Sequence, residues 1–189
     1  MKVKDLCDKA MINKTTFYSH YETMDLLHKQ VCLDFISDMI KQYKPIEKRW
    51  ETEKIKGLNI INDSYNANPD SMLAVIKTVL QNYEKPILFV LGNMGELGKD
   101  EVLYHQKVGI YLSDTISDGV SVITVGELAH EISDVLNNIG KTSLNFSTND
   151  EAGRYILDNV LEGTTIVLKA SHSMQFEKIL DYLKKEERL

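Results

Sequence analysis

The chain has 189 residues, of which 43% are apolar and 26% charged, and its formal net charge is −6. This composition is that of a folded globular protein and excludes a disordered, collagen-like or disulfide-rich chain. The longest apolar runs fall far short of the ~20 residues that cross a bilayer, and the first residues lack a signal-peptide core, so we expect no membrane partner. The two cysteines, Cys7 and Cys32, favour a cytoplasmic location and are predicted to be core thiols.

The charge is unevenly distributed along the chain. Residues 1–48 contain eight lysines and seven acidic residues, a net charge of +1, whereas residues 49–189 carry −7. Such asymmetry indicates two parts of different kinds. We place the boundary near residues 42–48 and predict a small all-helical segment over residues 1–44 and a larger domain over residues 45–189.

The first part is predicted to contain three helices. Apolar residues in 3–10 share one helical face. Asn13 is a suitable N-cap for a helix over residues 14–21, and Thr23 for a third helix, which should end at residues 43–45 because the residue before a proline avoids the helical region. The expected inner stripe of the third helix comprises Leu26, Leu27, Val31, Phe35 and Met39.

Strand and helix patterns alternate after Pro45. Strands are expected at residues 49–55, 58–62, 86–91, 121–125, 143–146 and 165–169, and helices at 69–83, 100–113, 128–139, 151–161 and 176–187. The strand at 86–91 is apolar on both faces, which is typical of a parallel sheet between two helical layers. The pattern predicts an α/β fold with a doubly wound, Rossmann-like, mostly parallel sheet of about six strands.

Residues 3–27 (VKDLCDKAMINKTTFYSHYETMDLL) resemble the DNA-reading helix-turn-helix of TetR-type repressors. The resemblance implies that Phe17 and Tyr21 partly pack the motif, and that its second helix faces the major groove. The residues that it places at DNA are Lys14, Thr15, Thr16, Tyr18 and His20.

The resemblance to TetR-type repressors is truncated. Their opening helix and long dimerising domain have no counterpart, and nothing visible would hold two motifs about 34 Å apart. Basic side chains are also few, so DNA binding at physiological salt is not expected. We favour a helical appendage over an operator-binding segment. Because a lone helix of about 20 residues is marginal, a homodimer through residues 24–43 is a further expectation.

Residues 45–189 resemble the C-terminal domain of muramyl ligases, particularly those that add D-alanyl-D-alanine to a UDP-muramyl tripeptide. The resemblance is carried by residues 45–51 (PIEKRWE), 60–72 (IINDSYNANPDSM), 91–98 (LGNMGELG) and 167–174 (VLKASHSM). It implies peptidoglycan synthesis, in which ATP and Mg²⁺ activate a carboxylate as an acyl phosphate that an amine attacks. UDP-muramyl peptide or D-alanyl-D-alanine would be the ligand, and the domain would mainly position it.

The candidate site lies where strands end and helices begin, which is where open α/β sheets place ligands. The substrate- or nucleotide-facing residues implied by the resemblance are Asp63, Tyr65, Asn66, Asn68, Pro69, Asn93, Glu96, His105, Lys169, Ser171 and His172. Asp63 and Asn68 have an alternative role as helix caps, and His105 as a locally hydrogen-bonded residue. Lys169 could meet either a carboxylate or an acyl phosphate. His28 and His130 are expected at the surface, and no metal site is expected.

No catalytic residue is assigned, because the parts that would complete a ligase are missing from the sequence. No Gly-x-x-x-x-Gly-Lys-Ser/Thr phosphate loop occurs in the 189 residues. Asn93, Ala170 and His172 stand where the family has Asp, Gly and Arg, and neutral His cannot replace a bidentate Arg clamp. We predict no independent ligase activity and no cofactor bound by this chain alone. A regulator with a ligand-sensing α/β domain, and a subunit that joins separate ligase domains in trans, stay as alternatives.

Overall fold

The computed structural model describes residues 2–42 and 49–186, with only the backbone over residues 35–42. The chain divides into two compact units, Met1–Pro45 and Ile46–Leu189, and each is described by itself. The predicted helix end at residues 43–45 and the side chains of Phe35 and Met39 lie outside the described residues.

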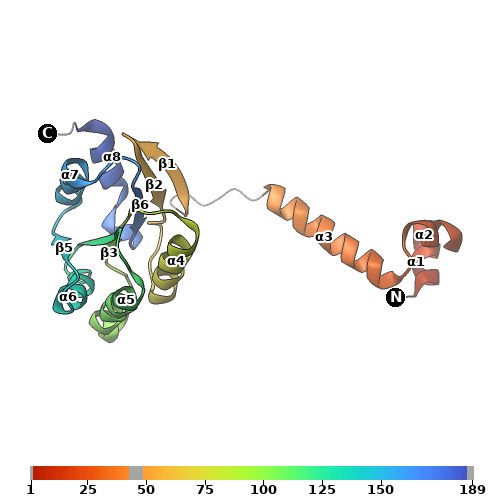
Figure 1. Ribbon diagram of the computed structural model, residues 1–189. Coiled ribbons are helices and arrows are strands. Elements are labelled where there is room, and N and C mark those ends of the chain that lie inside the picture. Colours follow the sequence, from red (N-terminus) through yellow and green to blue (C-terminus); the bar gives the residue numbers. More distant parts are fainter. Residues whose placement is uncertain (1, 43–48, 187–189) are drawn as a thin grey trace. The chain divides into compact units, whose positions relative to one another are not determined.

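The first unit contains α1 (Val3–Ala10), α2 (Lys14–His20) and α3 (Met24–Gln42) (Figure 1). Both predicted caps are confirmed: Asn13 Oδ1 accepts from the N–H of Thr16 at 2.7 Å, and Thr23 Oγ1 accepts from the N–H of Leu26 at 3.2 Å. Phe17 is buried and its ring lies 6.0 Å from that of Tyr21, so the predicted packing residues are confirmed.

Two predictions for α3 are wrong. Cys7 is buried, but Cys32 is exposed, because no other described part of this unit covers its side of α3. Leu26 is 45% exposed and does not belong to the stripe of Leu27 and Val31. At about 100° per residue, Leu26 lies roughly 120° around the helix from the middle of that stripe. Within the helical unit the stripe is uncovered, since Val31 is 55% exposed.

The second unit is built on one six-stranded sheet. Its strands are β1 (Glu51–Ile55), β2 (Leu58–Asn62), β3 (Ile87–Gly92), β4 (Val120–Val125), β5 (Ser143–Phe146) and β6 (Thr165–Lys169). Their order is β1-β2-β6-β3-β4-β5. Only β1 is antiparallel to its neighbour, whereas β2, β6, β3, β4 and β5 run parallel. This confirms the predicted doubly wound α/β fold.

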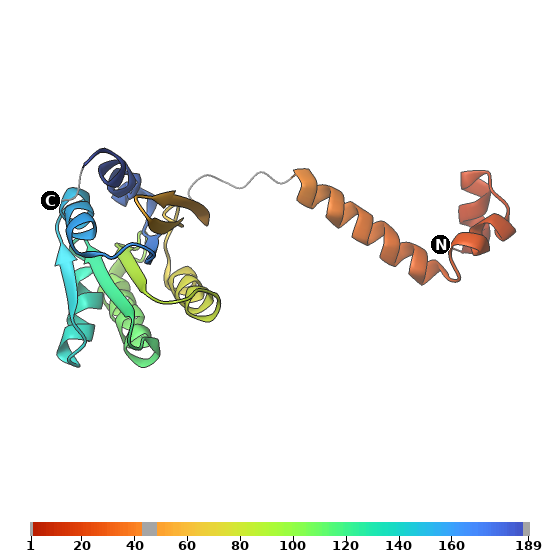
Figure 2. The same cartoon turned by 45° about the horizontal axis from the view of Figure 1, so that its top comes forward.

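Helices cover both faces of the sheet (Figures 1 and 2). The helices are α4 (Pro69–Asn82), α5 (Glu101–Thr115), α6 (His130–Asn138), α7 (Asn149–Asn159) and α8 (Glu177–Lys185), with short 3₁₀ turns η1 (Gly98–Asp100) and η2 (His172–Met174). Buried residues of α4, α5 and α6 pack on one face, and those of α7 and α8 on the other. The central strand β3 is buried throughout, as its apolar sequence predicts.

None of the helices in residues 2–42 and 49–186 is long and apolar enough to span a lipid bilayer.

Candidate functional site

The strand order brings three loops together at one edge of the sheet. β6 lies between β2 and β3, and the three strands are parallel, so their carboxyl ends are adjacent. The segments that follow them are residues 63–68, 170–174 and 93–98. The helices that follow these strands lie on opposite faces of the sheet, because α4 and α5 follow β2 and β3 on one face, whereas α8 follows β6 on the other. Open α/β sheets bind ligands at such a point.

Two cavities lie at this edge of the sheet, and Lys169 lines the first of them. Its side chain is 3% exposed, and its Nζ lies 2.8 Å from Asp63 Oδ2 and donates to the carbonyl oxygen of Asn66 at 2.5 Å. Asp63 Oδ1 also accepts from the N–H of Trp50 at 3.2 Å. The carboxylate predicted as one partner of Lys169 is therefore Asp63, and Asp63 does not cap α4.

We call this cavity the Lys169 pocket. It has a volume of about 270 Å³. Its lining residues are Arg49, Asp63, Asn66, Asn68, Ser71 and Lys169. Two cations and one carboxylate give the lining a net positive charge, which suits a single anionic group.

The start of α4 forms one wall of the Lys169 pocket. Asn68 Oδ1 accepts from the N–H of Ser71 at 2.8 Å, and Ser71 Oγ accepts from the N–H of Asn68 at 3.1 Å. Pro69 occupies the first helical turn, where its missing N–H costs nothing. Asn68 is thus the helix cap that the sequence offers as one alternative, and it lines the cavity as well.

A second cavity, the His172 pocket, adjoins the first through Asn66. It has a volume of about 380 Å³ and is lined by Tyr65, Asn66, Gly95, Glu96, Ser171, His172 and Ser173. The His172 ring lies 5.9 Å from that of Tyr65, and the Arg49 guanidinium lies 4.6 Å from the Tyr65 ring centre. Arg49, which lines the Lys169 pocket, therefore also contacts a residue that lines the His172 pocket.

The loop over residues 92–98 is fixed to the domain at three points. The carbonyl oxygen of Asn93 accepts from the N–H of Ser171 at 2.9 Å, and its side-chain oxygen accepts from the N–H of Ala129 at 2.8 Å. The N–H of Met94 donates to His105 Nε2 at 2.9 Å. At Gly92, the last residue of β3, the chain passes close to Ala170 after β6 and Phe176 before α8: an added Cβ would lie 2.7 Å from Ala170 and 2.6 Å from Phe176.

Three predicted site residues line neither pocket. His105 is fully buried with both ring nitrogens in hydrogen bonds, so its predicted contact with a ligand is corrected to the alternative local role. The side-chain oxygen of Asn93 accepts a hydrogen bond from the N–H at the start of α6. Pro69 is part of the first turn of α4. The other predicted residues are brought together in the two pockets: Asp63, Tyr65, Asn66, Asn68, Glu96, Lys169, Ser171 and His172.

Burial lowers the pKa of the His105 imidazole below its usual value. The hydrogen bond to the Glu101 carbonyl and the negative charges of Glu101 and Glu131 oppose this effect. Because Nε2 accepts from Met94, Nδ1 carries the proton and donates to the Glu101 carbonyl oxygen at 2.7 Å. The geometry thus requires a neutral ring. His28 and His130 are exposed, as predicted.

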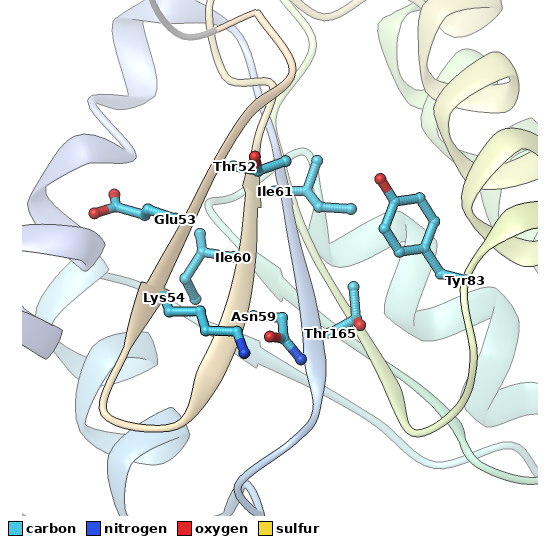
Figure 3. A pocket seen from close by; sticks show the side chains of 8 residues that line it. All are labelled: Thr52, Glu53, Lys54, Asn59, Ile60, Ile61, Tyr83 and Thr165. Carbon is cyan, nitrogen blue, oxygen red and sulfur yellow. The ribbon is translucent and has the colours of Figure 1, made fainter.

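A larger cavity, of about 450 Å³, lies beside the β1–β2 hairpin (Figure 3). Tyr83, which follows α4, faces Ile61 and Thr165 across it, while Glu53 points to the other side of β1 and pairs with Lys184 at 2.9 Å. None of the predicted site residues lines this cavity. The switch in strand order and the convergent polar groups favour the Lys169 and His172 pockets instead.

The described side chains form no metal-binding cluster. Among the side chains described for residues 2–34 and 49–186, no group of three or more His, Cys, Asp or Glu could hold a metal ion. The two pockets offer one carboxylate each, Asp63 and Glu96, and the Asp63 oxygens are already bound by Lys169 and Trp50. These residues do not fit a nucleotide with its Mg²⁺, so no chemical step is assigned to that group.

Sequence reasoning missed Arg49 as a lining residue. It lies 14 positions before Asp63, and the pairing of β1 with β2 brings this end of β1 back to the end of β2. One signal was available, because Arg49 is one of only three arginines in the chain and occurs within the block PIEKRWE. Ser71, Gly95 and Ser173 were also missed as lining residues.

Residues 48–172 match the family described as "Mur ligase, glutamate ligase domain". The chain belongs to the Mur ligase family. The UDP-N-acetylmuramoyl-tripeptide–D-alanyl-D-alanine ligase of Buchnera aphidicola subsp. Baizongia pistaciae is 40% identical over 131 residues, covering 67% of this chain and 26% of that protein. The Bacillus subtilis ligase of the same name is 36% identical over 128 residues, covering 66% and 27%.

Solved Mur ligases share the fold of the α/β unit. The MurF ligase of Thermotoga maritima in complex with ADP superimposes with a TM-score of 0.63 at 25% identity, over 76% of this chain and 32% of that one. A MurF structure from Acinetobacter baumannii gives a TM-score of 0.66 at 24% identity, over 77% and 32%. The chain thus spans about a quarter of the length of its curated relatives and corresponds to their Mur ligase C-terminal domain.

Proposed function

We propose that the α/β unit is the substrate-positioning domain of a ligase that adds D-alanyl-D-alanine to a UDP-muramyl peptide in peptidoglycan synthesis. The observation that carries the proposal is the Lys169 pocket, in which a buried ammonium is held by Asp63 at the edge where three strand ends meet. The curated relatives bear that ligase name. The proposed role is positioning, because a fixed cation orients a carboxylate without itself reacting.

The two pockets fit the two charged ends of a short zwitterionic dipeptide. Arg49 and Lys169 would hold its carboxylate, with Asn68 and Ser71 as polar neighbours. Glu96, the carboxylate of the adjoining His172 pocket, would face its ammonium group. Asn66 lines both cavities, so one small ligand can occupy both. The UDP-muramyl peptide, ATP and Mg²⁺ would belong to other domains of the ligase, in the same chain or in trans.

Titration of the full chain with D-alanyl-D-alanine tests this proposal by NMR. We expect backbone amides at Asn66, Ser71 and Glu96 to shift in a saturable way, and inorganic phosphate to compete. The double variant Asp63→Asn/Lys169→Met removes the cation together with its carboxylate and should not bind. Lys184→Met, in a surface ion pair with Glu53, is the matched control and should bind normally. Saturation that is unchanged in the double variant would overturn the assignment.

Activity is tested by adding the chain to a D-alanyl-D-alanine-adding ligase that lacks its own C-terminal domain. We expect no turnover from the chain alone. Turnover that appears only with the chain present would support assembly in trans. Absence of turnover, with dipeptide binding intact, would restrict the chain to a binding domain.

We infer that residues 1–44 are a helix-turn-helix segment of the TetR type, joined to the α/β domain of residues 45–189. The supporting geometry is the exposure of Lys14, Thr15, Thr16, Tyr18 and His20 on α2 while Phe17 and Cys7 are buried. Operator binding is not proposed, because α2 has a single lysine and counterion release would be small. A gel-shift selection with random duplexes at physiological salt should enrich no sequence, and an enriched motif would favour the regulator instead.

A further inference from the structure

His105 is buried beside the loop that forms one wall of the His172 pocket. It is on the second turn of α5, and its Nε2 accepts from the N–H of Met94 at 2.9 Å. Met94 is itself 2% exposed, and the next two residues, Gly95 and Glu96, line the His172 pocket. The hydrogen bond therefore lies one residue away from the pocket wall.

The chain around Glu96 depends on outside support. Glu96 has a left-handed backbone conformation, with φ at 59°, which is unfavourable for a residue with a side chain. Two of the three contacts that hold this loop involve Asn93, before Met94. The Met94–His105 hydrogen bond is the last of them before Gly95 and Glu96, and the Met94 side chain and Leu97 pack against the core on either side of this segment. Loss of the hydrogen bond would therefore loosen the backbone of the wall.

The hydrogen bond exists only while the ring is neutral. A protonated Nε2 would place an N–H against the N–H of Met94, and neither group could accept. The charged groups that face His105 are Glu101, one turn earlier on α5, and Glu131 on α6. Both favour the protonated ring, but burial opposes it more strongly.

We propose that neutral His105 is a positioning residue that holds Gly95 and Glu96 in the shape of the binding wall, and that its protonation releases them. The part of this proposal that concerns dipeptide binding rests on the proposed function. The part that concerns the loop stands on the contacts of Met94 alone. The site would accordingly bind its ligand above the pH at which the imidazole becomes protonated and lose it below.

Amide exchange at Met94 tests the loop directly, in the full chain, by NMR. Loss of one buried hydrogen bond should lower the Met94 protection factor about tenfold. In the wild type it should fall as pH is lowered through the protonation of His105. His105→Gln keeps an acceptor at the position of Nε2 but cannot titrate, so protection should stay high and independent of pH. His105→Phe should lower protection at every pH.

His130→Gln is the matched control. His130 is exposed on α6, with Nδ1 3.2 Å from Asp134, so the same substitution there should leave Met94 unchanged. If His105→Phe does not fold, the wild-type pH series and His105→Gln still decide the question. Equal loss of protection with pH in wild type and His105→Gln would overturn the proposal.

Titration with D-alanyl-D-alanine at pH 7.5 separates this inference from the proposed function. We expect a several-fold weaker affinity in His105→Phe and normal affinity in His105→Gln. Equal affinity in all three proteins would overturn the positioning role and leave the proposed function intact. No binding by any of them would refute the proposed function, and the Met94 exchange data would then decide the loop part alone.

Discussion

Lys169 and Asp63 form a nearly buried ion pair whose two members are costly to separate. Their side chains are 3% and 15% exposed, with 2.8 Å between Nζ and Oδ2. Removing one partner of such a pair leaves the other charge without compensation. Lys169→Met should therefore lower the free energy of unfolding by about 3 kcal/mol, measured by urea denaturation.

The double variant Asp63→Asn/Lys169→Met should recover most of that loss, because no unpaired charge then stays behind. The comparison is Lys184→Met, in an ion pair with Glu53 whose members are 49% and 37% exposed. Exposed pairs contribute little, so its effect should stay below about 1 kcal/mol. A single variant at Lys169 that is as stable as wild type would contradict the account of the pocket.

His105 makes the stability of the domain depend on pH. Burial lowers its pKa in the folded state, whereas in the unfolded chain it titrates near its usual value, about 6.5. The unfolded state therefore binds more protons below that pH, and folding loses stability as pH falls from about 6.5 through the lowered value.

The difference in unfolding free energy between wild type and His105→Gln tests this sign, because contributions from the other titrating groups cancel. We expect the wild type to lose stability relative to His105→Gln as pH is lowered from 7.5 to 5, and the difference to be constant above about pH 7. A difference that is flat over the whole range, or that favours the wild type in acid, would contradict a neutral buried ring.

Among the elements, α4 combines a capping function with the wall of a pocket. Asn68 caps α4 through the N–H of Ser71 and also lines the Lys169 pocket. Asn68→Ala should cost about 1 kcal/mol of unfolding free energy. Asn68→Asp should keep the cap and its stability but weaken dipeptide binding, because it adds a negative charge beside the site.

Thr148→Ala provides the matched control for the cap. Thr148 caps α7 through the N–H of Glu151 and lines neither the Lys169 nor the His172 pocket. It should cost a similar free energy without affecting binding, measured by urea denaturation and NMR titration. Equal binding by wild type and Asn68→Asp would place the anion away from α4.

The regular elements of the α/β unit follow closely from local sequence. The predicted bounds of β2, β5 and β6 are those observed, since each is a short β-rich run between turn residues. The boundaries that differ have local causes. β1 begins two residues late because Trp50 has a φ of 52°, and α7 begins two residues early because Thr148 and Glu151 form a capping box, a signal that was overlooked.

The sequence predicts which loops form the candidate site, but it does not predict every residue contact within the site. The strand ends carry polar motifs, so Asp63, Asn66 and Lys169 could be placed together from the fold. Arg49 was not recognised because it reaches the pocket through strand pairing. The resemblance predicts His105 at the ligand, because sequence spacing does not show that the loop after β3 folds back and covers it.

At the scale of the molecule, the two units differ in how much core they can form. The α/β unit buries apolar residues on both faces of its sheet. In residues 2–34, only Cys7 and Phe17 have buried side chains. So small a core gives little stabilisation. The helical unit should depend on further burial, and the stripe of Leu27 and Val31 on α3 is one apolar surface that can supply it.

We propose that two copies of the chain pair through α3, with Leu27 and Val31 at the interface. Sedimentation equilibrium of the full chain should show a dimer at micromolar concentration, and helical circular dichroism should increase with concentration. Leu27→Lys/Val31→Lys should give a monomer, because a charge buried in an apolar contact is costly. Leu144→Lys, at a 41% exposed apolar residue of β5, should leave the dimer intact. A monomeric wild type, or a dimer that survives the double substitution, would exclude pairing through this stripe.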